Sequence, residues 1–89
     1  MNGFVRVESP MVGTFYRAPQ PGAPPFVEEG STVAAGDTLC ILEAMKLMNA
    51  VKAELDAIVR RVHVENAQAV EYGTLLFELE PVTGPPSPS

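Results

Sequence analysis

The pattern of apolar and polar residues predicts short strands along most of the chain. Apolar and polar residues alternate over 4–8, and this run ends at Ser9-Pro10. A second run, 75–80, alternates in its second half and ends directly before Pro81. Because strand side chains point alternately to the two faces of a sheet, each run is typical of a strand with one buried face. Further extended, β-rich runs are found at 11–16, 38–42 and 58–64.

The segment from Leu39 to Leu55 allows two interpretations. Four of its polar residues fall at a spacing of three, at Glu43, Lys46, Asn49 and Lys52. The segment is also rich in Ala, Leu, Met, Glu and Lys, which favour helices. Local propensity alone therefore predicts an amphipathic helix here.

An internal repeat favours strands instead. At a shift of 37 residues, 26–43 aligns with 63–80 without a gap and with seven identities in eighteen positions. Because 75–80 has the strand pattern, 38–43 should also be a strand. A shift of 44 relates 4–8 to 48–52 in the same way. The repeat thus predicts a turn at 44–47, joining two half-repeats that pack around a pseudo-two-fold axis.

Two proline-rich stretches lie outside the predicted strands. The stretch 17–25 holds four prolines in nine residues, which excludes a helix or a central strand and predicts a stiff, protruding loop. This loop explains why the first half is longer than the second by seven residues, the difference between the shifts of 44 and 37. The stretch 81–89 holds another four prolines with serines and is expected to be a disordered tail, so the domain should span 1–80.

Composition narrows the class of protein. Eighty-nine residues make one small domain. The net charge of −5 argues against nucleic acid or an anionic membrane as the main partner, since both attract basic patches. No apolar run approaches the roughly 20 residues of a membrane span. A single cysteine, Cys40, predicts an intracellular protein in which this residue is a small buried hydrophobe.

The candidate for chemistry is Lys46, which lies between Met45 and Leu47 in the predicted turn. Pseudo-symmetry gives it counterparts near residues 2 and 83, so we expect it at the pole opposite the termini. The sequence supplies no general base beside this lysine, and no Ser-His-Asp set is present, so the chain alone should catalyse nothing. His63 has no partner at metal-ligand spacing, which predicts no metal site. Met48 is expected to be a core residue.

These motifs resemble a known family. The segment 43–49 (EAMKLMN) is similar to the biotin-attachment motif of biotinyl domains. The segments 9–15 (SPMVGTF), 36–40 (GDTLC) and 76–80 resemble the same family in the same order, so the resemblance covers about residues 5–80. Within the family, the chain resembles most the biotin carboxyl carriers of multisubunit acetyl-CoA carboxylase, which insert a "thumb" loop where this chain has 17–25.

The resemblance implies a flattened β-barrel or sandwich of two antiparallel four-stranded sheets, with Lys46 on an exposed hairpin. It implies that a biotin protein ligase attaches biotin to Lys46 and recognises its neighbours Ala44, Met45 and Leu47. A biotin carboxylase would then load the biotin with a carboxyl group, using ATP and bicarbonate. A carboxyltransferase would pass that group to acetyl-CoA, in the cytoplasm or the plastid stroma. Thumb contacts to biotin would come from Arg17, Ala18, Pro19, Gln20 and Pro21.

The sequence departs from the family pattern at two places. Leu47 stands where Met is more frequent, and Leu55-Asp56-Ala57 stands where the family usually has a Ser-Gly turn. Three alternatives stay open at this point: another biotin-dependent carboxylase, a lipoyl carrier domain, or an interaction module whose lysine is incidental. Lipoyl hairpins typically read Asp-Lys-Ala, whereas Met45 and Leu47 flank the lysine here.

Overall fold

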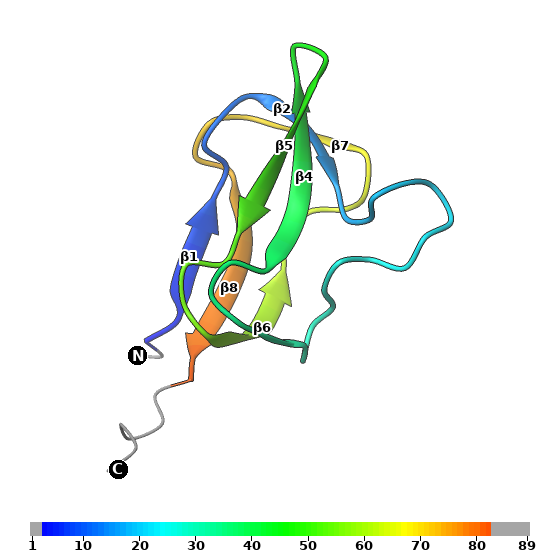
Figure 1. Ribbon diagram of the computed structural model, residues 1–89. Helices are drawn as coiled ribbons and strands as arrows, with labels where there is room; N and C mark the ends of the chain where they lie inside the picture. The colour runs from blue at the N-terminus through cyan, green and yellow to red at the C-terminus, as the bar shows by residue number, and fades with distance from the viewer. Residues whose placement is uncertain (1–2, 83–89) are drawn as a thin grey trace.

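Residues 3–82, which the computed structural model describes, form two antiparallel four-stranded sheets packed face to face (Figure 1). The strands are β1 (Val5–Glu8), β2 (Gly13–Tyr16), β3 (Thr32–Val33), β4 (Thr38–Ala44), β5 (Leu47–Lys52), β6 (Ala57–Val62), β7 (Gln68–Val70) and β8 (Leu75–Pro81). No helix is found within this range. The all-β prediction is therefore confirmed, and the helical interpretation of 39–55 is wrong because that segment is a hairpin of β4 and β5.

The two sheets confirm the internal repeat. One sheet has the strand order β1-β8-β6-β3 and the other has β5-β4-β2-β7. Exchanging each strand with its counterpart in the other half-repeat converts the first order into the second. Each half therefore contributes two strands to each sheet, and the two halves interleave.

The pairing registers repeat as well. Val5 pairs with Leu79 in the first sheet, and Asn49 pairs with Leu42 in the second, as shifts of 44 and 37 residues require. The turns that precede β4 and β8 also match: Gly36 and Gly73 hold φ angles of 96° and 88°, a region that favours glycine. The counterparts of Lys46, at residues 2 and 83, lie outside the described residues.

The core lies between the sheets and draws on both halves. Phe15 of β2 and Phe77 of β8 are fully buried, and their ring centroids are 5.8 Å apart. Around them pack apolar side chains from both sheets and from the loops. Strands β4 and β8 show the same sequence of buried and half-buried positions, which explains why their similar sequences fold alike.

Several local predictions need correction. Strand β8 runs through Pro81, and the backbone N–H of Val82 donates to the carbonyl of Asp56 (3.0 Å), so ordered structure extends past residue 80. The remaining tail residues, 83–89, lie outside the described part of the chain. Strand β2 starts two residues later than the apolar run suggests. Ala57, which stands where the family usually has a turn, opens β6 as a buried residue, and its φ angle is not positive.

The β4–β5 hairpin extends from one end of the sandwich, and β1 begins and β8 ends at the other (Figure 1). The loop between β2 and β3 projects sideways beside this hairpin. Lys46 is thus presented far from the described ends of the chain, as the repeat predicted.

Candidate functional site

The turn that carries Lys46 is as short as a hairpin allows. Ala44 pairs with Leu47, so only Met45 and Lys46 connect the strands. Their φ angles are 54° and 68°, which is the type I′ geometry that best matches the twist of paired strands. That geometry normally selects Asn-Gly, because other residues pay roughly 1–2 kcal/mol each in the left-handed region. Met and Lys are therefore retained here against local backbone preference.

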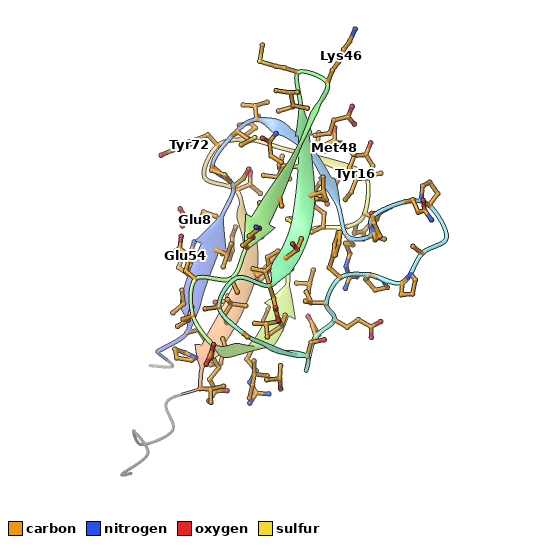
Figure 2. All side chains as sticks on the ribbon, viewed as in Figure 1. Glu8, Tyr16, Lys46, Met48, Glu54 and Tyr72 are labelled. Atoms are coloured by element: carbon orange, nitrogen blue, oxygen red, sulfur yellow. The ribbon has the colours of Figure 1, made fainter. Side chains whose placement is uncertain are left out.

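The side chains at the turn point into solvent. Met45 is 93% exposed, and Lys46 extends away from the body of the domain (Figure 2). Met48 is 61% exposed, so the expectation that it is a core residue is wrong. The reason is that β5 is an edge strand whose first two residues rise above the sandwich with the turn.

The base of the hairpin is held by close backbone contact and side-chain hydrogen bonds. A Cβ on Gly13 would lie 2.6 Å from the carbonyl oxygen of Glu43, so only glycine lets β2 approach β4 this closely. The Asn49 Nδ2 donates to the carbonyls of Leu42 and Leu47, each at 3.2 Å. These contacts fix the direction in which the turn, and with it Lys46, projects.

Tyr16 and Glu43 form a polar pair on the thumb side of the hairpin. The Tyr16 hydroxyl donates to Glu43 Oε1 at 3.3 Å. Partial desolvation, together with the nearby Glu43 carboxylate, raises the pKa of the Tyr16 phenol above its ordinary value of 10.0. The phenol therefore stays protonated, as a donor, throughout the physiological pH range.

The thumb is an ordered loop with a closed base. The N–H of Phe26 donates to the carbonyl of Arg17 at 2.7 Å, which brings the two ends of the loop together. The N–H of Arg17 donates to Asn66 Oδ1 at 2.8 Å, and its Nη2 donates to the carbonyl of Val27 at 3.2 Å. Arg17 thus anchors the thumb to the domain.

A groove of about 460 Å³ separates the thumb from the hairpin. The predicted thumb residues all line it, and the structure brings them together with residues from four other parts of the chain. The lining is Tyr16, Arg17, Ala18, Pro19, Gln20, Pro21, Gly22, Ala23, Pro25, Glu43, Met48 and Asn66. Sequence reasoning missed Tyr16, Glu43, Met48 and Asn66, because cross-strand pairing and a contact between distant loops bring them to the thumb.

The remaining predicted recognition residues lie on the other side of the hairpin. Ala44, Met45 and Leu47 line a shallow hollow together with Gly13 and its neighbours. Successive strand residues point to opposite faces, so Leu47 and Met48 face the two sides of the hairpin. The structure therefore divides the motif into a thumb face and an opposite face.

The described residues supply no second reactive group beside Lys46. Burial raises the pKa of the Cys40 thiol to about 12, which keeps it protonated and inert. No group of three metal-ligating side chains occurs within 3–82. In the same range, no helix is long and apolar enough to cross a bilayer. What the site offers chemically is one exposed primary amine on a stiff turn beside a sheltered groove.

A family model described as "Biotin-requiring enzyme", covering biotin and lipoyl domains, matches residues 5–79. Among curated relatives, the "Biotin carboxyl carrier protein of acetyl-CoA carboxylase" of Pseudomonas aeruginosa is 52% identical over 89% of this chain and 50% of its own length. The protein of the same name from a Nostoc species is 51% identical over 84% of this chain and 41% of its own. The "Biotin carboxyl carrier protein of acetyl-CoA carboxylase 2, chloroplastic" of Arabidopsis thaliana is 47% identical over 84% of this chain and 29% of its own length. The chain thus spans half or less of the length of these relatives.

Solved structures agree with the fold. A single-chain, multi-domain long-chain acyl-CoA carboxylase superposes with a TM-score of 0.78 and 26% identity, over 91% of this chain and 8% of that one. A Shewanella frigidimarina protein titled as a succinylglutamate desuccinylase or aspartoacylase superposes with a TM-score of 0.71 at 17% identity, over 92% and 21%. The second likeness concerns the fold alone.

Proposed function

Because this chain belongs to the biotin/lipoyl family of biotin-requiring enzymes, we propose that it is a carrier domain with biotin attached to Lys46 through an amide bond. One observation carries the proposal. Lys46 lies at the tip of a two-residue turn whose backbone geometry disfavours both residues present, and its neighbours Met45 and Leu47 are exposed. Stability explains neither feature, whereas display of a modified lysine explains both.

The residues fit this group. Its carboxyl end needs an accessible amine, which Lys46 provides, and its ring system needs a mostly apolar surface within reach, which the thumb groove provides. When bound, biotin supplies a ureido nitrogen that can hold a carboxyl group. The protein supplies the tether, which raises the concentration of that group at each partner site.

Attachment needs an activated acyl donor and a second enzyme. Lys46 Nζ must lose a proton and attack the acyl carbon of biotin that ATP has converted to an acyl phosphate anhydride. The new C–N bond forms as the C–O bond to phosphate breaks, and the phosphate leaves with that electron pair. No side chain in the described site is placed to accept the proton, so the biotin protein ligase must do so.

The thumb and the hairpin would have different roles in carrying the biotin. The pair of Tyr16 and Glu43, the apolar Met48 and thumb residues 17–21 form the walls against which the tethered ring would rest between transfers. Lys46 itself stays outside the groove (Figure 2). We infer that the thumb shelters the carried group while the exposed face of the turn is free to meet partner enzymes.

The partners follow from the relatives' names. Relatives from bacteria and chloroplasts are named as carriers of acetyl-CoA carboxylase. The proposed whole reaction is thus loading by a biotin carboxylase and transfer to acetyl-CoA by a carboxyltransferase, giving malonyl-CoA in the cytoplasm or the plastid stroma. The domain itself would be a non-catalytic part of a multisubunit enzyme.

Reconstitution tests this assignment. The biotinylated chain, mixed with purified biotin carboxylase, carboxyltransferase, ATP and bicarbonate, should produce malonyl-CoA from acetyl-CoA. Lys46→Arg should abolish the product, whereas Lys52→Arg, which changes the only other lysine, should not. A faster reaction with a longer acyl-CoA would assign the domain to another carboxylase. Attachment of lipoate in place of biotin would overturn the proposal.

A further inference from the structure

An exposed apolar surface lies beside Lys46 on the face of the hairpin opposite the thumb. Val12, Met45 and Leu47 are strongly exposed and line one shallow hollow. Tyr72, which is 78% exposed, lies in the neighbouring loop at the same end of the domain (Figure 2). We call these four side chains, Val12, Met45, Leu47 and Tyr72, the apolar patch.

Hydrogen bonds join the two loops that carry Val12 and Tyr72. The N–H of Ser9 donates to the carbonyl of Thr74 at 2.8 Å, and the N–H of Gly73 donates to the carbonyl of Ser9 at 2.8 Å. Gly13, which follows the first loop, pairs with Val70, which precedes the second. Val12 and Tyr72 are thus held near each other by fixed backbone.

The internal repeat provides a control for this surface. At the opposite pole, Asp56 occupies the position equivalent to Val12, and Ala35 occupies the position equivalent to Tyr72. There, Asp56 Oδ1 accepts a hydrogen bond from the N–H of Ala35 at 2.9 Å. The same backbone conformation therefore tolerates an aspartate and an alanine at these positions, and the aspartate side chain binds the backbone of the neighbouring loop.

The fold does not require apolar side chains at Val12 and Tyr72. Exposed apolar groups grouped around one functional residue mark a contact surface rather than a packing need. We propose that the apolar patch is the docking surface for the ligase that acylates Lys46. This inference rests on the proposed function and adds to it a specific surface.

The reach of Lys46 selects the ligase over later partners. An unmodified lysine has a four-carbon stem of only about 6 Å, so its amine enters an active site only if that enzyme covers the turn and its surroundings. The biotinylated side chain is much longer and can enter a site from further away. The enzyme that meets bare Lys46 must therefore contact the patch most closely.

The charge beside the patch indicates which charges the ligase should present there. The exposed Glu71 directly precedes Tyr72, so an acidic group borders the patch. An enzyme that holds an acyl phosphate anhydride needs cationic groups around its active site. We therefore expect the ligase to present an apolar centre with a basic rim, which complements this pole.

The test uses substitutions that the repeat itself supplies. The double variant Val12→Asp/Tyr72→Ala places at this pole the residues found at the other, so the fold should tolerate it. The milder Val12→Ala/Tyr72→Ala pair serves as a second variant. Val82→Asp is the control, because it removes a half-exposed apolar side chain, 48% exposed, away from Lys46. Thermal unfolding of each chain verifies folding.

Ligation kinetics with purified ligase, ATP and biotin give the result. We expect KM for the double variant to rise about tenfold or more, with kcat at saturating domain within twofold of the parent. The Val82 variant should match the parent. An unchanged KM in both patch variants would overturn the proposal, as would normal ligation followed by impaired loading by biotin carboxylase. Failure of the parent chain to be biotinylated would instead contradict the proposed function.

Discussion

The two poles of this domain share one backbone and differ in what they expose. Strand order, pairing register and the turns at Gly36 and Gly73 repeat between the halves. At the pole bearing Lys46, Tyr16 bonds to Glu43, whereas the equivalent pair at the other pole is Arg60 with Glu80, 2.6 Å apart. The shared features maintain the fold, and the differences are where function should be sought.

Positions that repeat between the halves differ from those that do not in whether packing explains them. At the repeated positions, the same packing and turn geometry occurs in both halves. The unmatched features include the thumb, the turn at Met45 and Lys46, and the exposed Val12 and Tyr72. Each adds backbone strain, loop length or exposed apolar area without a stabilising contact that would explain it.

The largest expected effect concerns the core that both halves share. Phe15→Ala should destabilise the domain by about 3–5 kcal/mol, because it removes a fully buried ring. Phe77→Ala should cost a similar amount. Since the two rings are in contact, the double variant should lose less than the sum of the two. Urea unfolding measures all three, and strict additivity would show that the halves do not share one core.

A second prediction concerns a matched pair of positions, Gly13 and Ala57. Gly13→Ala should destabilise by about 1–3 kcal/mol, because the new methyl group would press on the Glu43 carbonyl. Ala57 sits at the equivalent position without such a conflict, and Ala57→Gly should cost about 1 kcal/mol through backbone entropy. Urea unfolding compares the two variants. A neutral Gly13→Ala would mean that β2 and β4 can separate without loss.

A third prediction reverses sign between the halves. Gly30 and Ala67 are equivalent, and both have positive φ, 95° and 69°. Ala67→Gly should therefore stabilise the domain by about 0.5–1 kcal/mol, and Gly30→Ala should destabilise it by a similar amount. Thermal unfolding of both variants checks the signs. A destabilising Ala67→Gly would contradict the equivalence of the two turns.

The smallest expected effect on stability comes from removing the thumb. The Arg17–Phe26 hydrogen bond already closes the loop, so replacing 18–25 by Asn-Gly should change the unfolding free energy by no more than about 1 kcal/mol. Arg17 is kept because it bonds to Asn66 and Val27. Loading by biotin carboxylase should change while ligation of Lys46 stays normal. A domain that unfolds would show that the loop is structural.

The sequence predicted six of the strands, but it missed the short strands β3 and β7, although both lie within the aligned repeats. Local propensity would have made 39–55 helical, and only its alignment with 75–80 identified β4 correctly. Met48 was misjudged because apolar character does not reveal that an edge strand extends beyond the sandwich.

The site was predictable only in part. Lys46, its turn and the thumb followed from motif and repeat. The groove did not, since Tyr16, Glu43 and Asn66 reach it through cross-strand pairing and a loop contact between distant residues. The backbone strain at Met45 could not be predicted either, because a sequence does not give the φ angle of a residue.

The most direct measurement is the location of biotin on the intact chain. Peptide mapping by mass spectrometry after reaction with biotin protein ligase, ATP and biotin distinguishes Lys46 from Lys52, which lies exposed at the other end of β5. We predict one biotinyl group per chain, entirely on Lys46, and none on Lys52. An unmodified chain, or modification shared between the two lysines, would contradict the account.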